Sequence, residues 1–309
     1  MVDVVVCDSL PIVRTRTYRG MTGPKICVQY RGGYYILKSR QRLYDKGFSN
    51  VTLHYANDPI SEYVGSHIYE IVGIPVHETI LGTYNDRLCV LCKDLAYPKQ
   101  IVELRDVRNI IMSEEVTQSN DGMSSSISDI MQIIDECNAI DYKESTRQRF
   151  YQMLVVDALI GNTDRNNSNW GFLATDNDTL ELCPVYDCGG CLNNKASDEQ
   201  LSEYINDEEK MRQLALEYTV HLKDVHDNEI NPFHYIEHNL DNPFILRSLA
   251  LVKDVDENKI FDLIDSLDNI CTSDRRWYYK RILSMRLAKL RSLADSNKSL
   301  KGLFQKAEG

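Results

Sequence analysis

Carboxylate and amide side chains gather in one loop and in a short segment that follows it. Residues 161–169 read Gly-Asn-Thr-Asp-Arg-Asn-Asn-Ser-Asn, so that Asn169 follows Asp164 by five positions, and further on Asp187 leaves an apolar run into a glycine turn. Transfer of a phosphoryl group needs a carboxylate facing the acceptor hydroxyl and a few oxygen ligands for Mg²⁺. The spacing therefore predicts Asp164 as the catalytic base and Asn169 and Asp187 as ligands of Mg²⁺.

A lysine and a glutamate upstream complete the charges that such a reaction requires. Lys38 ends the strand-like stretch 35–38, and Glu62 lies in the first turns of the helix expected after it. A lysine held by a glutamate can contact nucleotide phosphates, so we expect a Lys38–Glu62 ion pair. The segment before the first strand carries glycines, whose backbone amides can approach phosphate oxygens closely. The residues expected to cover the phosphates are Gly20, Met21, Thr22 and Gly23.

Each of these features also has an ordinary explanation. Loops rich in Asn and Asp are common turns, and a lysine at the end of a strand is usually solvated. Their order along the chain favours the functional interpretation. A glycine-bearing loop, a lysine, a glutamate, the Asp164–Asn169 pair and then Asp187 follow one another as in a kinase.

Two Cys-x-x-Cys pairs raise the alternative of zinc or redox chemistry. Cys89 and Cys92 lie on an expected strand, where an odd offset places their side chains on opposite faces. They therefore cannot chelate one ion together. Cys188 and Cys191 remain candidates for oxidation.

The N-terminal part of the chain reads as strands around one helix. Alternating apolar residues and turn residues predict hairpins over 26–38 and 76–92, and apolar residues at helical spacing predict a helix over 58–73. After residue 92 the sequence pattern becomes helical and polar. This change predicts a boundary between two lobes, an N-terminal lobe over 1–93 and a C-terminal lobe over 94–309.

The C-terminal part reads mainly as helix. We predict a helix over 142–160, a small hairpin over 170–185 and helices from about residue 198 onward. The polar segment 113–129 has few large apolar residues, so we expect a mobile insertion. The basic amphipathic helix at 275–293 either docks an acidic partner or a membrane surface, or packs as the last helix of the lobe, and we favour packing.

Composition narrows the choice of partners and compartment. The chain has 35 Lys and Arg against 46 Asp and Glu, and its net charge of -11 argues against direct binding of nucleic acid. No run of about 20 apolar residues that could span a membrane occurs in the sequence. Nine scattered cysteines resemble free thiols, which favours the cytoplasm, although specialised export routes stay open.

Taken together, the motifs resemble the HipA-type kinases, and among them the CtkA-like branch. The segments that carry the resemblance are 161–169, Tyr186–Asp187, Ser61–Tyr63, Gly82–Tyr84 and Cys92–Leu95. The resemblance implies an α+β, bilobal protein-kinase-like fold. Its N-lobe would be mainly β with one key helix, and its C-lobe mainly α-helical.

The resemblance also implies ligands and residue roles. ATP and Mg²⁺ would serve transfer to Ser or Thr hydroxyls of proteins, including autophosphorylation, for which Thr22 is the matching residue. Lys38 would contact the phosphates, and Asn166 stands where many relatives carry a His. Backbone atoms between the lobes would meet adenine, at Cys92, Lys93 and Asp94. An antitoxin partner is not implied, because no separate subdomain precedes the glycine-bearing region.

Two other functions fit the same residues. A small-molecule or lipid kinase would use the same ATP site, but the acidic segment 198–209 disfavours an anionic lipid and suits a basic protein substrate. A non-catalytic ATP-binding scaffold would be expected to have lost one of the charged or amide groups named above, and all are present.

Overall fold

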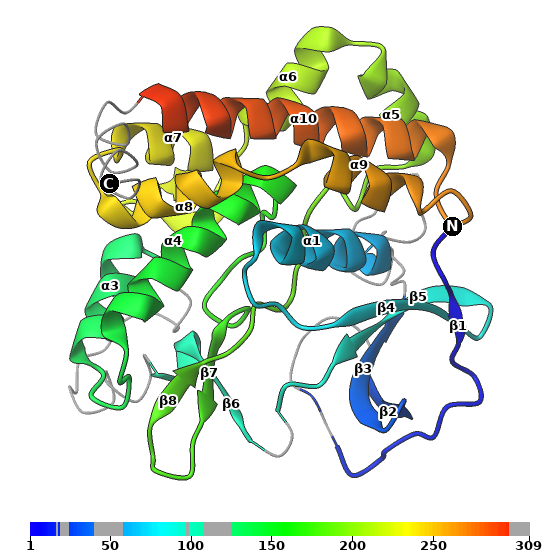
Figure 1. The fold of residues 1–309 in the computed structure, drawn as a ribbon, viewed down its shortest axis with the longest axis horizontal. Helices are drawn as coiled ribbons and strands as arrows, with labels where there is room; N and C mark the ends of the chain where they lie inside the picture. Colours follow the sequence, from blue (N-terminus) through cyan, green and yellow to red (C-terminus); the bar gives the residue numbers. More distant parts are fainter. Residues whose placement is uncertain (17, 19–24, 40–57, 97–98, 108–124, 297–309) are drawn as a thin grey trace, which may run out of the picture.

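The computed structural model describes residues 1–16, 18, 25–39, 58–96, 99–107 and 125–296. A curled sheet and a bundle of helices occupy opposite sides of the molecule, with helix α1 between them (Figure 1). The sheet has the order β1-β4-β5-β3-β2. Its strands are β1 (Val5–Val6), β2 (Ile26–Tyr30), β3 (Gly33–Ser39), β4 (Thr79–Tyr84) and β5 (Arg87–Lys93).

The two predicted hairpins of this sheet are confirmed, and their turns explain them. Arg31 and Gly32 have positive φ values of 46° and 75°, and Asn85 and Asp86 have values of 49° and 57°. Two successive residues with positive φ form the turn whose twist matches that of antiparallel strands. Each turn therefore fixes the register of its hairpin, β2 with β3 and β4 with β5.

The second hairpin begins later than predicted. Strand β4 starts at Thr79, whereas Val76 forms a parallel bridge with Val185. The amide of His77 donates to the Val185 carbonyl at 2.9 Å. Pairing with this distant segment takes residues 75–77 out of the hairpin and places them beside the chain that leads to Asp187.

Helix α1 (Asp58–Val72) forms as predicted and connects the two parts of the molecule. Its apolar residues Ile60, Val64 and Ile68 are at most 1% exposed. They belong to a hydrophobic cluster that also includes Val90 of the sheet and residues of the C-terminal helices. One face of α1 is thus buried by both parts, which holds Glu62 at a fixed place between them.

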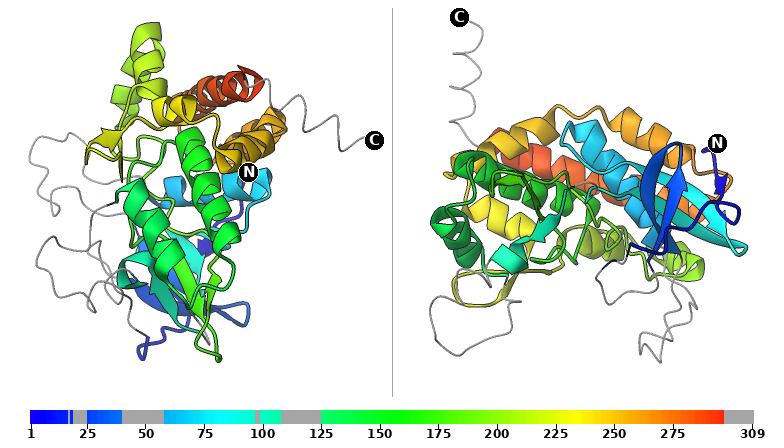
Figure 2. Two further views of the ribbon diagram at one scale, coloured as in Figure 1. Left: turned by 90° about the vertical axis from the view of Figure 1, so that its left-hand side faces the viewer. Right: turned by 90° about the horizontal axis from the view of Figure 1, so that it is seen from below.

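The C-terminal part consists mainly of helices, most of which pack against the last one, α10. They are α3 (Ile127–Glu136), α4 (Lys143–Ile160), α5 (Asp198–Ile205), α6 (Glu208–Leu216), α7 (Pro232–His238), α8 (Pro243–Lys253), α9 (Glu257–Asp265) and α10 (Ser273–Ser296). In Figure 1 and in the left view of Figure 2, α10 and the β1–β5 sheet lie at opposite sides of the molecule.

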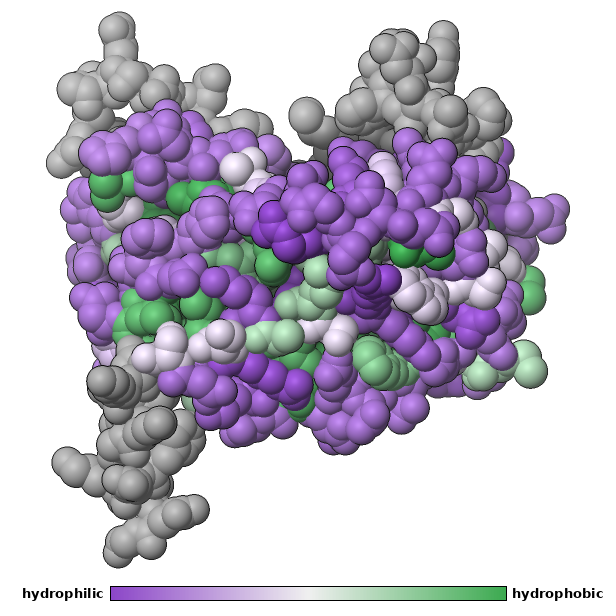
Figure 3. Space-filling view, turned by 90° about the horizontal axis from the view of Figure 1, so that it is seen from above, coloured by the Kyte–Doolittle hydropathy of each residue, from purple (hydrophilic) through white to green (hydrophobic). Residues whose placement is uncertain are grey.

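Helix α10 packs into this bundle, which is the alternative that the sequence favoured. Tyr278, Tyr279 and Ile282 are fully buried, and the buried Arg286 donates to the carbonyls of Leu214 and Ala215 on α6. Seen from above, this side of the molecule is mainly hydrophilic, with apolar residues confined to strips between polar ones (Figure 3).

Two further sheets correct the sequence prediction. Strand β6 (Ile101–Glu103) joins the predicted small hairpin, β7 (Gly171–Ala174) and β8 (Leu180–Leu182), to make three strands. The region predicted to be entirely helical contains a hairpin of β9 (Val220–Lys223) and β10 (Glu229–Ile230). Its turn is stabilised by the Asp224 carboxylate, which accepts two backbone amides and competes with helix formation.

Three further expectations can be set against the structure. The predicted insertion at 113–129 lies largely outside the described residues, and α3 already begins at Ile127 within it. The lobe boundary at 93 and 94 stays a prediction, although β5 ends at Lys93. Within the described ranges, no helix is long and apolar enough to cross a membrane.

Candidate functional site

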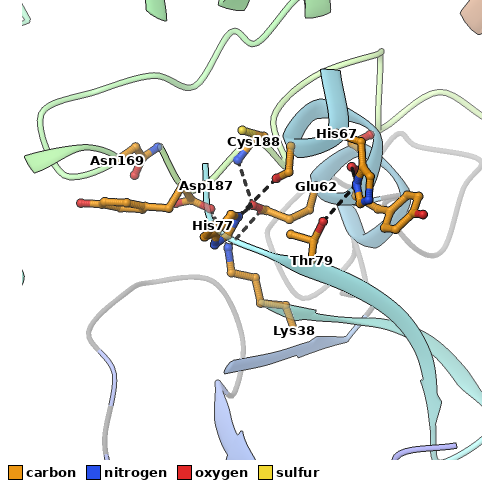
Figure 4. Close-up of polar contacts among 12 residues, drawn as sticks. Lys38, Glu62, His67, His77, Thr79, Asn169, Asp187 and Cys188 are labelled. Atoms are coloured by element: carbon orange, nitrogen blue, oxygen red, sulfur yellow. Dashed lines mark hydrogen bonds and ion pairs between the residues drawn. The ribbon is translucent and has the colours of Figure 1, made fainter. Parts of the chain in front are cut away.

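Lys38, Glu62 and Asp187 come together where β3, α1 and the segment after β8 meet (Figure 4). Lys38 Nζ lies 3.0 Å from Glu62 Oε2 and 2.9 Å from Asp187 Oδ1. The predicted Lys38–Glu62 ion pair is therefore present. Burial lowers the pKa of Lys38, but Asp187 and Glu62 outweigh it and hold that pKa well above its usual value. The site thus keeps a permanent cation beside Asp187.

Glu62 is fixed by three different partners. Besides Lys38, its carboxylate contacts His77 Nε2 at 3.0 Å and accepts the backbone amide of Cys188 at 3.0 Å. Burial alone would raise the pKa of Glu62, but Lys38 and His77 bring it far below its usual value. No local sequence pattern indicated His77, because its contact with Glu62 depends on the pairing of residues 75–77 with Val185.

The Asp164 loop packs directly against the segment after Asp187. Asp164 is exposed, and its amide is held by Asn162 Oδ1 at 3.2 Å. A Cβ atom added at Gly190 would lie 2.8 Å from Asp164 Cβ, so only glycine permits this close approach. Although its side chain is 60% exposed, partial desolvation by the loops packed around it and the charge of Asp187 raise the pKa of Asp164, which makes it a stronger base than an ordinary carboxylate.

The buried Arg165 anchors this loop to its surroundings. Arg165 Nε lies 2.7 Å from Asp157 Oδ2 on α4, and its Nη1 donates to the carbonyls of Asn169 and Tyr186 at 2.7 and 2.6 Å. One guanidinium thus joins α4, the Asp164 loop and the residue before Asp187. A sequence signal existed, since Asp157 is a lone charge in an otherwise apolar run.

The predicted metal ligands have the donor chemistry that Mg²⁺ prefers. Asn169 Nδ2 donates to the Asp164 carbonyl at 2.6 Å, which leaves the amide oxygen of Asn169 for a cation. Asp187 supplies carboxylate oxygens from a backbone with a φ of 60°. Carboxylate and amide oxygens fit Mg²⁺ completed by phosphate and water.

Asn166 stays within its own loop. Its Oδ1 accepts the amide and the hydroxyl of Ser168 at 2.9 and 2.6 Å, and its Nδ2 contacts the Asp164 carbonyl at 3.1 Å. The side chain therefore shapes the loop. A contact from Asn166 to phosphate stays a prediction.

The predicted adenine-binding segment is bound into the protein on several sides. The amides of Lys93 and Asp94 donate to the carbonyls of Glu78 and Tyr34 at 2.8 and 2.9 Å. The Asp94 carboxylate accepts the Tyr18 hydroxyl at 2.6 Å and also pairs with Arg16. The carboxylate of Asp94 thus has protein partners already. Adenine contacts by this segment stay a prediction.

Cys92 is buried directly behind Lys38. The thiol is 1% exposed, and burial raises its pKa well above the usual value, so it is protonated at neutral pH. Cys89, three residues earlier, packs instead against Cys7 in a separate cluster. The prediction that Cys89 and Cys92 point to opposite faces is confirmed.

His221 is a neighbour of Asp164 that the sequence did not indicate. It lies on β9, with Nε2 3.7 Å from Asp164 Oδ1 and Nδ1 3.3 Å from Glu229. Since the hairpin that carries His221 was not predicted, the position of this histidine could not be predicted either.

The predicted glycine-bearing loop lies outside the described residues. It contains the residues expected to cover the phosphates, Gly20, Met21, Thr22 and Gly23.

Comparisons with known proteins agree with this geometry. The family model of the HipA-like C-terminal domain matches residues 20–231. The Helicobacter pylori serine/threonine-protein kinase CtkA is 29% identical over 268 residues, which cover 86% of this chain and 79% of CtkA.

Two solved structures share the fold. The crystal structure of the H. pylori proinflammatory kinase CtkA matches with a TM-score of 0.83 and 26% identity, over 94% of this chain and 99% of that one. The HipA, HipB and operator DNA complex of Shewanella oneidensis MR-1 matches with a TM-score of 0.54 over 93% of this chain and 68% of that one. At 13% identity it bears on the fold alone.

These matches confirm the predicted bilobal kinase-like fold and the predicted class of enzyme, a serine/threonine-protein kinase. The family model covers more than half of the chain. The chain therefore belongs to the family of proteins with a HipA-like C-terminal domain.

Proposed function

We propose that this kinase uses ATP and Mg²⁺ and transfers the γ-phosphoryl group to Ser or Thr hydroxyls of proteins. The observation that carries the proposal is the link from Lys38 to both Glu62 and Asp187, with the Asp164 loop packed against the segment after Asp187. A cation for the phosphates, a carboxylate for the metal ion and a base for the acceptor hydroxyl would thus share one site.

Each group has one role in this proposal. Lys38, positioned by Glu62, neutralises the phosphates of ATP, and Asn169 and Asp187 hold Mg²⁺. When bound, Mg²⁺ would offset the negative charge on the phosphate oxygens. Asp164 orients the acceptor hydroxyl and takes its proton, for which its raised pKa suits it.

The surroundings of Asp164 favour a basic protein acceptor. The neighbouring hairpin presents Glu229 and Asp227, whose side chains are 47% and 70% exposed. The net charge of -11 would repel an anionic lipid surface. All nine cysteines are free thiols, which supports a reducing compartment such as the cytoplasm.

The test is incubation of the purified protein with γ-labelled ATP, Mg²⁺ and a basic protein, in parallel with Asp164→Ala. We expect label transfer to fall by about 10²- to 10⁴-fold in the variant, with ATP binding retained. Asp295→Ala is a matched control, because it removes an exposed aspartate that pairs with Lys253 and belongs to neither the Asp164 loop nor the adjacent hairpin. Equal transfer by Asp164→Ala would remove Asp164 from the mechanism.

The same assay separates the rival functions. Label that appears only in small molecules would indicate a small-molecule kinase, and ATP binding with no transfer would indicate a scaffold. Label in the kinase itself that is lost from Thr22→Ala would support autophosphorylation at Thr22.

A further inference from the structure

Three metal-binding side chains of different kinds meet behind Lys38. Glu62 comes from α1, His77 from the segment before β4, and Cys92 from β5, and a donor atom of each lies within 4.8 Å of the other two. All three are at most 4% exposed. In the proposed phosphoryl transfer Glu62 positions Lys38 and His77 supports Glu62, whereas the Cys92 thiol has no role.

The spacing is close to that of a tetrahedral metal site. Donor atoms around one Zn²⁺ lie about 3.3–3.7 Å apart, given bonds of about 2.0–2.3 Å. His77 Nε2 and Glu62 Oε1 are 3.0 Å apart. Small rotations of these buried side chains would therefore suffice for one ion to contact all three donors.

The charges also balance for a divalent ion. Carboxylate, imidazole and thiolate are all ligands that Zn²⁺ takes, and thiolate favours it strongly over Mg²⁺. On binding, the Cys92 thiol loses its proton to solvent, and the two negative ligands cancel the charge of the ion. Binding then adds one positive charge to a buried site in which Lys38 faces two carboxylates, so that the site as a whole becomes neutral.

We propose that Glu62, His77 and Cys92 form a binding site for Zn²⁺ that competes with the catalytic arrangement around Lys38. An ion bound there draws on the negative charge of the Glu62 carboxylate, whose Oε1 faces His77 and whose Oε2 lies 3.0 Å from Lys38 Nζ (Figure 4). The Lys38–Glu62 pair is then weakened, and Asp187 becomes the main partner of Lys38. Occupation of this site therefore inhibits ATP-dependent transfer.

A cavity beside His77 offers a route for an ion to enter the site. A cavity of about 410 Å³ lies between α1 and the segment before β4, and His77 is part of its wall together with Ser66, His67 and Glu78. An ion can reach His77 from this cavity, and a water molecule in it can be the fourth ligand.

Binding is tested with Co²⁺, a spectroscopic substitute for Zn²⁺, on the full chain after removal of metals by a chelator. We expect a thiolate-to-cobalt absorption band in the near ultraviolet that Zn²⁺ abolishes by displacement. Cys92→Ser should remove the band, and His77→Gln should weaken Co²⁺ binding by more than about 100-fold, beyond what loss of a mere supporting contact costs. Circular dichroism verifies that each variant is folded.

Cys89→Ser is the matched control, because Cys89 is a buried cysteine of the same strand that packs in the other cluster. It should keep the band. Absence of the band from the unaltered protein, its persistence in Cys92→Ser, or its loss from Cys89→Ser would each overturn the proposed site.

Inhibition, unlike binding, rests on the proposed function and is measured with excess Mg²⁺ and ATP. The activity of each variant with Zn²⁺ is compared with its own activity without Zn²⁺. We expect inhibition of the unaltered enzyme and of Cys89→Ser, and none of Cys92→Ser. If Cys92→Ser were still inhibited by Zn²⁺, the inhibiting ion would be bound at the Mg²⁺ ligands. That result would overturn the proposal that Zn²⁺ at Glu62, His77 and Cys92 inhibits transfer. A protein with the cobalt band but no transfer to any acceptor would contradict the proposed function and leave the metal site intact.

Discussion

At the scale of single residues, the site depends on one cation placed between two carboxylates. Lys38 is 22% exposed, Glu62 is almost fully buried, and Asp187 keeps 35% of its side chain exposed. Burial favours the neutral form of both acids, but Lys38 keeps the pKa of each below its usual value. Both acids are therefore ionised at neutral pH, as phosphate positioning and metal binding require.

Replacement of Lys38 by Met should destabilise the protein in a pH-dependent way. It removes the cation that Glu62 and Asp187 share, which should cost about 2–3 kcal/mol at neutral pH, less than for a fully buried pair because Asp187 is partly solvated and Glu62 keeps its contacts with His77 and the Cys188 amide. Carboxylates with lowered pKa stabilise above their unfolded pKa of about 4, and this stabilisation is lost as pH falls through the folded value. Without Lys38 the two acids protonate more readily, so the loss of stability caused by Lys38→Met should be smaller at acidic pH.

Urea unfolding at neutral and acidic pH measures this difference. Lys99→Met is the control, because Lys99 forms an exposed pair with Glu181 and should cost at most about 1 kcal/mol at either pH. If Lys38→Met lost the same stability at both pH values, Lys38 would not act by stabilising the ionised forms of Glu62 and Asp187.

His221 should set the lower pH limit of activity. Partial desolvation and the charge of Asp187 raise the pKa of Asp164, and the charge of His221 acts in the opposite direction. Since the base acts when ionised, His221→Ala should move the acidic limb of kcat/KM to higher pH. The shift should be less than about one unit, because His221 and Asp164 are 55% and 60% exposed.

The pH profile of kcat/KM provides the measurement. His234→Ala removes another exposed histidine, which pairs with Glu217, and should leave the limb unchanged. An acidic limb that stays in place or moves to lower pH in His221→Ala would show that this histidine does not act on the base.

At the scale of elements, the end of α4 and the loop after it act as one unit. Gly161 ends the helix with a φ of 68°, in the left-handed conformation that glycine readily adopts. Arg165 then returns to Asp157 on the last turns of the helix, and the Tyr69 hydroxyl also donates to Asp157 at 2.8 Å. The loop that carries Asp164 is therefore held by buried contacts on the helix side.

Asp157→Ala should release this loop. It leaves the buried guanidinium of Arg165 without its carboxylate, which should destabilise the protein by about 3–5 kcal/mol and reduce kcat even where the variant is folded. Chemical unfolding and a transfer assay at low temperature measure the two effects. Glu209→Ala is the control, because it breaks an exposed pair with Arg212 and should leave stability almost unchanged. Similar losses in both variants would show that the buried pair is no anchor.

The elements also show what a sequence can and cannot predict here. Turn residues such as Gly32 and Asn85 act on their own strands, so both hairpins of the large sheet were predictable. The β9–β10 hairpin was not, because only Val220 and Leu222 alternate there before a polar turn. Contacts of His77 and His221 join segments far apart in the chain, and local patterns carry no information about them.

At the scale of the whole molecule, the sheet and the helices are joined by shared contacts. One hydrophobic cluster includes Val64 of α1, Val90 of β5 and Leu287 of α10. At the N-terminus, the Val2 amide donates to the Ser266 carbonyl at 2.7 Å, while β1 a few residues later pairs with β4. Two separate connections thus cross from the sheet to the helices, and both must break if the parts are to unfold independently.

The molecule should therefore unfold as one cooperative unit, although it has two predicted lobes. Trp170 and Trp277 both lie after residue 94, so tryptophan fluorescence reports on the C-terminal part, whereas far-ultraviolet circular dichroism reports on both. The two transitions in urea should coincide. ATP with Mg²⁺ should move both together, by about 2.7 kcal/mol at a ligand concentration 100 times Kd. If the fluorescence transition stays in place while the dichroism shifts, the lobes unfold separately and the shared core does not couple them.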